Sequence, residues 1–173
     1  MFDSHPNRVL LLADTHLGAD QAQRLLDALA GRQSRARAIL HAGDVTDTSV
    51  LDELEQFAPV FAVLGNNDRT MSLPERLVVD IDGCRFAMVH DSGESVGRGS
   101  RLRRWFPDAD VVVFGHSHMP WWQTDIRASD GHVQHHVNPG SAIQRRRAPR
   151  RTVAWVEITD GAVTSVEHDP LTD

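Results

Sequence analysis

Five short blocks of the sequence carry side chains that commonly bind hard or borderline metal ions. The blocks are Asp14-Thr15-His16, Gly43-Asp44, Gly65-Asn66-Asn67-Asp68, His90, and Gly115-His116-Ser117-His118. An apolar run comes directly before each block, such as residues 9–13 before the first and residues 111–114 before the last. One such block would be weak evidence, but five in this arrangement favour a metal-centred catalytic site.

The apolar runs are the elements that must position these side chains. They cover residues 9–13, 38–42, 60–64, 86–89 and 111–114, and His41 is the one polar residue among them. Short apolar runs are typical of buried strands, and an α/β sheet gathers its ligand-binding residues at the carboxyl ends of such strands. We therefore expect the Asp, His and Asn side chains to meet at one edge of a sheet.

A pair of divalent metal ions about 3.5–4 Å apart can clamp an in-line displacement at phosphorus. Such a pair needs a bridging carboxylate, further carboxylate or imidazole ligands, and an exposed bridging water. The expected ligands are Asp14, His16 and His118 for one ion, Asn66, His90 and His116 for the other, and Asp44 for both. Because this set offers oxygen and nitrogen donors without a thiolate, we expect two ions of Mn first, with Fe, Zn, Co and Ni as alternatives.

His116 and His118 follow the last apolar run and lie two residues apart. If the extended conformation continues beyond residue 114, their imidazoles project to the same side of the chain.

Length and composition are those of an ordinary globular protein. The chain has 173 residues, 40% of them hydrophobic and 24% charged, which predicts one domain over residues 1–173 with a loose start at residues 1–7. Cys84 is the only cysteine, so an internal disulfide is excluded and a reducing compartment is expected. We find neither the apolar core of a signal peptide nor the ~18 apolar residues of a membrane span. We expect a cytoplasmic protein without a membrane partner, and the net charge of −6 disfavours nucleic acid.

The first half of the chain alternates strands and helices, and the second half is rich in strands. The expected strands are residues 8–13, 37–42, 60–64, 77–81, 85–89, 111–114, 121–127, 132–137, 152–158 and 162–168. Hairpin turns are expected at Asp82-Gly83, Asp130-Gly131 and Asp160-Gly161.

Three helices are expected from apolar residues at helical spacing. Their apolar faces are Ala22, Leu25, Leu26 and Leu29 in the first, Val50, Leu54 and Phe57 in the second, and Leu102, Trp105 and Phe106 in the third. Gly31 and Pro107 end the first and third helices. Ser49 with Asp52 resembles a capping box at the start of the second.

The metal motifs resemble those of the calcineurin-like metallophosphoesterases. The matching segments are Asp14-x-His16, Gly43-Asp44, Gly65-Asn66-x-Asp68, His90 and Gly115-His116-x-His118, in the same order and spacing. Asn138-Pro139-Gly140-Ser141 is similar to a signature of the small single-domain branch, which contains bacterial and archaeal phosphodiesterases and non-catalytic retromer-subunit relatives. The resemblance covers residues 8–160. It implies an α/β fold, a four-layer αββα sandwich with a dinuclear metal site at the carboxyl ends of the strands.

Two positions depart from the broader family pattern. In many members a His follows the ligand Asn and can serve as general acid, whereas Asn67 stands there in this chain. An amide has no proton to give at neutral pH, so Asn67 cannot supply that function. His90 is usually followed by Gly, and Asp91 takes that place here.

Several neighbouring polar residues have a supporting or a purely structural interpretation. Asp68 is expected to support the site through hydrogen bonds, because ligand imidazoles need an orienting acceptor, and the alternative is a turn Asp. Asn138 is expected to hold the loop beside His116, and His41 either supports the site or is a satisfied buried His. We interpret His135 and His136, on opposite faces of one strand, as structural, and Thr15 and Ser117 as small spacers between ligands.

An Arg-rich segment covers residues 145–151. It contains Arg145, Arg146, Arg147, Arg150 and Arg151. It is either a solvated loop or a phosphate-binding lip beside the metals, because Arg matches phosphate oxygens bidentately. Trp121 and Trp122 begin a strand. One is expected in the core, and the other either is structural or stacks on a base or packs in an oligomer interface.

These features predict a metal-dependent phosphodiesterase for a small phosphodiester or nucleotide-like substrate. A water or hydroxide that bridges both ions would attack phosphorus in line. The expected catalytic residues are Asp44, Asn66, His90 and Asp68. A phosphomonoesterase or nucleotide phosphatase on the same site and a non-catalytic scaffold of the same fold are the alternatives. Assembly into a homo-oligomer stays open.

Overall fold

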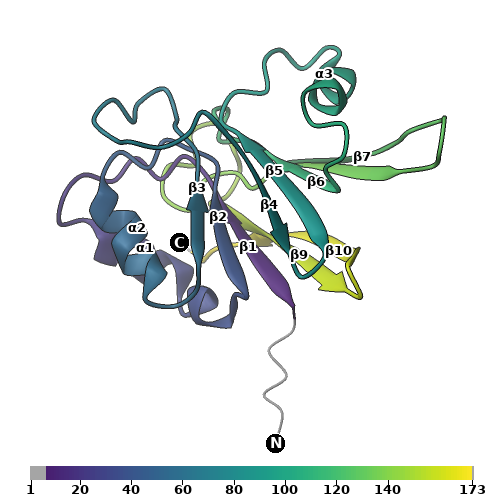
Figure 1. Ribbon diagram of the computed structural model, residues 1–173. Helices are drawn as coiled ribbons and strands as arrows, with labels where there is room; N and C mark the ends of the chain where they lie inside the picture. The colour runs from purple at the N-terminus through teal and green to yellow at the C-terminus, as the bar shows by residue number, and fades with distance from the viewer. Residues whose placement is uncertain (1–6, 173) are drawn as a thin grey trace, which may run out of the picture.

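The chain forms two five-stranded sheets, which the computed structural model describes over residues 7–172 (Figure 1). In order across the first sheet, the strands are β10 (Ala162–Pro170), β9 (Thr152–Thr159), β1 (Arg8–Leu12), β2 (Ala38–His41) and β3 (Val60–Ala62). In order across the second, they are β4 (Arg76–Ile81), β5 (Cys84–Val89), β6 (Val111–Val113), β8 (Val133–Asn138) and β7 (Trp121–Ile126). The helices are α1 (Ala22–Leu29), α2 (Thr48–Glu55) and α3 (Arg98–Trp105), and Arg32–Arg35 forms a short 3-10 helix.

The two sheets face each other across one apolar layer, and helices cover their outer faces (Figure 1). Side chains alternate along a strand, so Leu11 of β1 packs with Met88 of β5 between the sheets. Leu10 points the other way, into the apolar cluster that contains the buried residues of α1 and α2. On the second sheet, Val112 of β6 packs in one cluster with Leu102 of α3. This is the four-layer αββα sandwich that the resemblance implied.

Parallel strands direct the five polar blocks to the same end of the molecule. β1, β2 and β3 are parallel in the first sheet, and β5, β6 and β8 are parallel in the second. The blocks follow β1, β2, β3, β5 and β6, each just past the carboxyl end of its strand. The loops after these strands therefore meet at the upper end of the sandwich in Figure 1.

Tight hairpins connect β4 to β5 and β9 to β10 at the predicted Asp-Gly pairs. The φ angles of Asp82, Gly83, Asp160 and Gly161 are 49°, 84°, 51° and 78°. A type I′ turn requires this left-handed conformation at both central residues, and Asp-Gly adopts it readily. The third predicted turn, at Asp130-Gly131, lies in the longer connection between β7 and β8.

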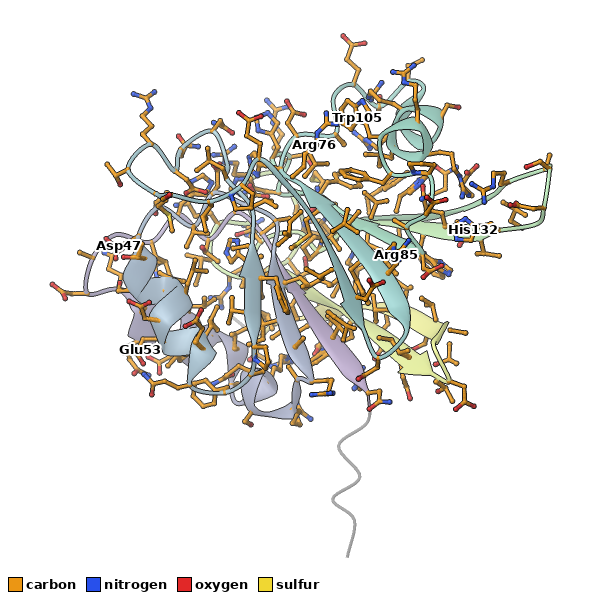
Figure 2. All side chains as sticks on the ribbon, viewed as in Figure 1. Asp47, Glu53, Arg76, Arg85, Trp105 and His132 are labelled. Atoms are coloured by element: carbon orange, nitrogen blue, oxygen red, sulfur yellow. The ribbon has the colours of Figure 1, made fainter. Side chains whose placement is uncertain are left out.

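The start and the end of α2 differ from the prediction. The N-cap is Asp47, whose side chain accepts a hydrogen bond from the backbone N of Ser49 at 3.0 Å (Figure 2 labels Asp47). Because Asp47 already satisfies a free N–H at the helix start, the capping box assigned to Ser49 and Asp52 is wrong. The helix ends at Glu55, so Phe57 lies beyond it and is 40% exposed instead of part of the apolar face.

The first residues and the segment after α1 add two details. Of the predicted loose start, only Asn7 is described, and its carbonyl accepts a hydrogen bond from Ile158 N at 2.9 Å. Residues 1–6 lie outside the described part of the chain. The 3-10 helix was not predicted, because its four residues have no apolar spacing. No helix within residues 7–172 combines the length and the apolar character that crossing a bilayer requires.

An arginine on β4 connects the second sheet to α3. The Arg76 guanidinium carbon lies 4.2 Å from the centroid of the Trp105 ring, and the two side chains are neighbours in Figure 2. This is the distance of a cation–π contact. The Arg76 side chain is therefore turned toward α3. We call the loops that carry the five polar blocks the ligand loops.

Candidate metal centre

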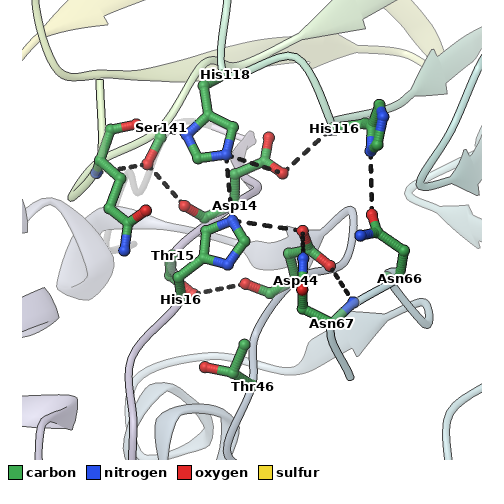
Figure 3. A network of polar contacts seen from close by, with 12 residues as sticks. Asp14, Thr15, His16, Asp44, Thr46, Asn66, Asn67, His116, His118 and Ser141 are labelled. Carbon is green, nitrogen blue, oxygen red and sulfur yellow. Dashed lines mark hydrogen bonds and ion pairs between the residues drawn. The ribbon is translucent and has the colours of Figure 1, made fainter. Parts of the chain in front are cut away.

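The ligand loops bring all seven predicted ligands into one region, and Figure 3 labels all of them except His90. They are Asp14 and His16 after β1, Asp44 after β2, Asn66 after β3, His90 after β5, and His116 and His118 after β6. We call Asp14, His16 and His118 the buried group, and Asn66, His90 and His116 the outer group. Among the described residues, the side chains of Asp14, His16 and His118 are close enough to hold one metal ion, and so are those of Asp14, Asp44 and His90.

In the buried group, the Nε2 atoms of two imidazoles lie next to each other. These atoms of His16 and His118 are 3.1 Å apart, and the rings stack with centroids 5.0 Å apart. His118 Nε2 lies 3.7 Å from Asp14 Oδ1. Burial lowers the pKa of both imidazoles, and that of His118 falls to about 4. Neutral rings have lone pairs available for a metal at pH 7.

In the outer group, one amide oxygen joins two imidazoles. Asn66 Oδ1 lies 3.0 Å from His90 Nε2 and 3.0 Å from His116 Nδ1. His90 is buried, whereas Asn66 and His116 are exposed. A surface cavity of about 370 Å³ opens beside this group, and Glu75 and Asp91 are among the residues that line it. The outer group therefore faces solvent and the buried group does not.

Asp44 lies between the two groups. Its Oδ2 is 3.4 Å from His16 Nε2 and 3.5 Å from His90 Nε2. Asn67 holds this carboxylate, because its backbone N donates to Oδ1 at 2.9 Å and its Nδ2 donates to Oδ2 at 2.8 Å. Burial alone would raise the pKa of Asp44, but hydrogen bonds from His90 and Asn67 outweigh it and hold the pKa below its usual range. The carboxylate is ionised and can accept a cation on either side.

A backbone carbonyl orients one imidazole in each group. His90 Nδ1 donates to Ala42 O at 2.8 Å, and His118 Nδ1 donates to Gln144 O. When Nδ1 carries the only proton of the ring, the lone pair is on Nε2, which faces the site in both residues. Metal-binding histidines are commonly oriented in this way. The sequence contains no signal for Gln144, because any residue type supplies a carbonyl.

An unpartnered oxygen on Asp14 shows that the site suits a cation. Asp14 Oδ1 accepts a hydrogen bond from His116 N at 3.1 Å, whereas Oδ2 is buried and has no hydrogen-bond partner among the described residues. Burial raises the pKa of Asp14 to about 7, although the charge of His90 acts to lower it. A buried carboxylate oxygen is costly to leave unpaired. A divalent ion would supply the missing partner, and the carboxylate, amide and imidazole donors fit Mn, Fe, Zn, Co or Ni.

Most of the predicted ligands have a left-handed backbone. The residues are Asp14, His16, Asp44, His116 and His118, with φ between 49° and 71°. The extended conformation expected from His116 to His118 is therefore wrong. Because the chain turns at each ligand, the two rings diverge: His116 faces Asn66, and His118 faces His16 (Figure 3).

Asp68 makes supporting hydrogen bonds to backbone N–H groups, and not to the ligand imidazoles that were expected as its partners. Its carboxylate accepts hydrogen bonds from the backbone N of Asp44 at 2.9 Å, Thr46 at 2.7 Å and Gly65 at 2.8 Å. Thr46 has a φ of 76°, which a β-branched residue rarely adopts. The carboxylate thus clamps a strained turn that carries Asp44, and Asp68 is a positioning residue.

Two glycines allow the loops after β2 and β3 to approach each other. A Cβ added to Gly65 would lie 2.1 Å from Asp44 N, and one added to Gly43 would lie 2.8 Å from His90 Nδ1. Both distances are too short for real atoms. A side chain at either position would push a candidate ligand away.

Side chains of the Asn138–Ser141 loop form hydrogen bonds with the ligand loops. Asn138 Nδ2 donates to Gly115 O at 2.9 Å and to Ser117 Oγ at 3.1 Å, which confirms its predicted role beside His116. Ser117 is therefore a hydrogen-bond partner as well as a spacer. Ser141 Oγ donates to Asp14 O at 2.8 Å, a role that the sequence analysis missed although it identified the motif.

A buried pair lies behind the ligands. Thr15 Oγ1 and His41 Nε2 are 3.0 Å apart, so Thr15 also does more than separate two ligands. Burial lowers the pKa of His41 to about 4. His135 and His136 occupy successive positions of β8 and therefore opposite faces, as predicted, and His136 Nε2 bonds to Gln134 Oε1 at 2.8 Å.

Within the Arg-rich segment, the charge of Arg146 acts on the buried group. Burial is the largest influence on the pKa values of Asp14, His16 and His118, and Arg146 lowers all three. Arg145 instead donates to Ala148 O at 2.9 Å. Of the Trp pair, Trp121 packs against Phe114 with ring centroids 5.8 Å apart, whereas Trp122 is 47% exposed.

The geometry agrees with a known family. Residues 8–161 match the model of the calcineurin-like phosphoesterase superfamily domain. This chain belongs to that superfamily. A probable metallophosphoesterase of Methanocaldococcus jannaschii is 36% identical over 157 residues, which cover 87% of this chain and 75% of that protein. The superfamily binds divalent metals, and the resemblance inferred from the motifs is confirmed.

Solved structures share the superfamily fold. Vps29 from Entamoeba histolytica, crystallised with Zn²⁺, aligns with a TM-score of 0.67 and 22% identity over 94% of this chain and 97% of that one. A structure described as a novel archaeal phosphodiesterase aligns with a TM-score of 0.67 and 18% identity over 95% of this chain and 99% of that one. At these identities the likeness establishes the fold.

Proposed function

We propose that this chain is a metal-dependent phosphodiesterase that uses two divalent ions. The observation that carries the proposal is the position of Asp44, whose Oδ2 lies 3.4 Å from His16 and 3.5 Å from His90, one in each group. When bound, the two ions would act as Lewis acids on the phosphate and activate a water for in-line attack. Membership of the superfamily supports hydrolysis of a phosphoric ester.

The residues of the chain have separate tasks in this proposal. The buried and outer groups would hold one ion each, and Asp44 would be the ligand that both ions share. Asn67 orients Asp44 through two hydrogen bonds, and Asp68 fixes the turn beneath it. Arg146, whose charge acts on the buried group, would bind a non-bridging phosphate oxygen on that side.

The cavity beside the outer group favours a diester over a monoester. Its 370 Å³ adjoin Asn66 and His90, so a second ester group has room next to the phosphorus. Glu75, Arg76 and Asp91 line the cavity, and the Arg76 guanidinium also contacts the Trp105 ring. This balance of charge disfavours a second phosphate and favours a neutral or cationic alcohol as the leaving group. A monoester would leave the cavity unused.

The alternatives use the same geometry in other ways. A phosphomonoesterase would bind a dianion between the two groups without using the cavity. The similarity to Vps29 raises the alternative of a scaffold with the same fold. A scaffold would need no metal ligands, yet all seven predicted ligands are present here. The complete set supports a catalytic role.

The test compares bis(p-nitrophenyl) phosphate with p-nitrophenyl phosphate, each with Mn²⁺ and with a chelator. We expect faster hydrolysis of the diester, dependent on metal and absent in Asp44→Asn. Faster hydrolysis of the monoester would support the phosphatase, and no hydrolysis of either by the metal-loaded protein would support the scaffold. Metal analysis that finds at most one ion per chain in fully active protein would contradict the two-ion site.

A further inference from the structure

β7 is an edge strand whose inner face is apolar and exposed. Among residues 7–172, it pairs with β8 alone. Trp122 is opposite Val137 of β8, which lies in the apolar layer between the sheets, so Trp122 and Ile126 belong to that same face. Trp122 is 47% exposed and Ile126 is 65% exposed. The apolar inner face therefore continues past the region that the first sheet covers.

The first sheet covers the inner face of the second sheet only as far as the β9–β10 hairpin. A cavity of about 290 Å³ separates Val133 and His135 of β8 from residues 161–163 at the start of β10. In Figure 1, β7 and the turn that follows it extend well to the right of this hairpin. Trp122 and Ile126, with the polar Thr124 between them, thus form a largely apolar strip along a free edge.

The other three sheet edges carry more protective features than β7. An edge strand is usually protected by charges, Pro, a bulge or short length. β3 has three residues, β10 has a register shift between Val163 and Ser165 and ends in Pro170, and β4 places Arg76 and Asp80 on its exposed face. On β7 the one charged residue, Asp125, points to the outer face, where Arg103 Nε donates to it at 2.8 Å. The strip of β7 contains no charge.

We propose that β7 is the interface of a homodimer, in which two copies pair edge to edge and antiparallel about a twofold axis at Thr124. In this register Trp122 lies opposite Ile126 of the second copy, and the pair occurs twice, on either side of the two Thr124 residues. A twofold interface requires such a self-complementary surface. On the outer face, Gln123 lies opposite Asp125, so no like charges oppose each other. The second copy would flank the apolar strip, so that Trp122 and Ile126 of the two copies pack side by side, and would join two five-stranded sheets into one.

The first experiment measures mass in solution by sedimentation over the micromolar to millimolar range. We expect a dimer that dissociates on dilution and an Ile126→Lys variant that stays monomeric. Ile126 is mostly exposed, so the Lys would be solvated in the monomer and would disturb only the interface. Val78→Lys is the matched control, because Val78 is 49% exposed on β4, the opposite edge of the same sheet. A wild type that stays monomeric, or equal dissociation by both variants, would overturn the proposal.

The second experiment tests the register by oxidation of single cysteines. Thr124→Cys places two thiols at the axis and should form a disulfide between copies faster than Val78→Cys. Asp125→Cys should form this disulfide more slowly than Thr124→Cys, since residue 125 lies opposite Gln123 of the second copy and not opposite itself. Cys84 does not interfere, because it is buried and burial raises the pKa of its thiol to about 12. Equal cross-linking at positions 124 and 78 would exclude this register.

Discussion

The buried group and the outer group each combine two imidazoles with one oxygen ligand, a carboxylate in the buried group and an amide in the outer group, but they are held very differently. The side chains of Asp14 and His118 are fully buried. Ser141 donates to the backbone carbonyl of Asp14, and His118 donates to the backbone carbonyl of Gln144. In the outer group only His90 has such support, from Ala42 O, whereas Asn66 and His116 are exposed. Held and shielded ligands bind a metal with little rearrangement, while exposed ones must first be ordered. We infer that the ion of the buried group is retained more tightly and that the outer ion exchanges.

The largest expected effect is at the residue that belongs to both groups. Asp44→Asn removes the shared negative charge, so both ions should bind more weakly and kcat should fall by roughly 10³-fold or more, as the loss of several kcal/mol implies. Metal analysis and turnover of bis(p-nitrophenyl) phosphate measure the two effects. Loss of one ion with half of the activity retained would place the shared ligand elsewhere.

The next effect concerns the proton of the leaving group beside the outer group. Asn67 directs its Nδ2 to Asp44 and has no proton to give, and a general acid is typically worth roughly 10²–10⁴-fold. Rates should therefore fall steeply as the leaving-group pKa rises across a series of phosphodiesters. Asn67→His should flatten this dependence, provided that the new imidazole reaches the departing oxygen.

Asn67→Ala is the control, because it also loses the hydrogen bond to Asp44 without adding an acid. A shallow dependence in the wild type would mean that another donor, such as Asp91, already protonates the leaving group.

The difference in retention can be tested with one His from each group. His118→Ala should lose the ion of the buried group and keep more binding in the outer group. His116→Ala removes a proposed ligand, so the affinity for the outer ion should fall by at least about 10–100-fold, the scale already seen when a residue that only supports a metal ligand is lost. Metal content after dialysis of the two variants distinguishes the groups. Equal loss of metal ions from both variants would contradict the proposed difference in retention between the groups.

A smaller effect is expected from the Arg-rich segment beside the buried group. Replacing Arg145, Arg146 and Arg147 by Ala should raise KM with little change in metal content, and most of the effect should come from Arg146. The expected rise is roughly fivefold, about the strength of one exposed ion pair, and it should shrink at high salt. Arg147→Ala is the matched control from the same loop. An unchanged KM in the triple variant would identify the segment as a solvated loop.

The smallest effect lies outside both groups and provides a reference for them. Burial lowers the pKa of His136 from 6.5 to about 4, so the unfolded chain takes up this proton at higher pH than the folded one. The stability linked to His136 is therefore fully present above pH 6.5 and is lost as the pH falls from 6.5 toward 4. His136→Gln keeps a donor for Gln134 but does not titrate, so its urea-unfolding free energy should depend less on pH in this range. An unchanged pH dependence would rule out His136 as a contributor.

Residue type and spacing predicted the fold and the ligand set well. Buried parallel strands are continuous apolar runs, and the side chains after Leu12, His41 and Val113 have a composition that few structural roles require. The Asp-Gly hairpin turns were equally predictable, because few other residue pairs readily adopt the left-handed conformation at two successive positions.

The support of the site was much less predictable. Gln144 contributes a carbonyl, which every residue has, and Asp68 bonds to backbone N–H groups that no sequence pattern marks. Asp47 and Ser49 are both good N-cap residues, so composition alone did not decide between them. The direction of His116 and His118 depended on φ, which the sequence pattern left open.

The left-handed backbone at five ligand positions limits how this site can change. Asp, Asn, His and Gly are the residue types that adopt this conformation most readily, whereas β-branched residues are strained in it. Asp14, His16 and Asp44 can therefore be exchanged mainly among side chains that also bind metals, or for Gly, which binds none. A library built to alter metal preference should sample this small alphabet at these positions and place its wider diversity at Asn66 and His90, whose backbones do not have positive φ.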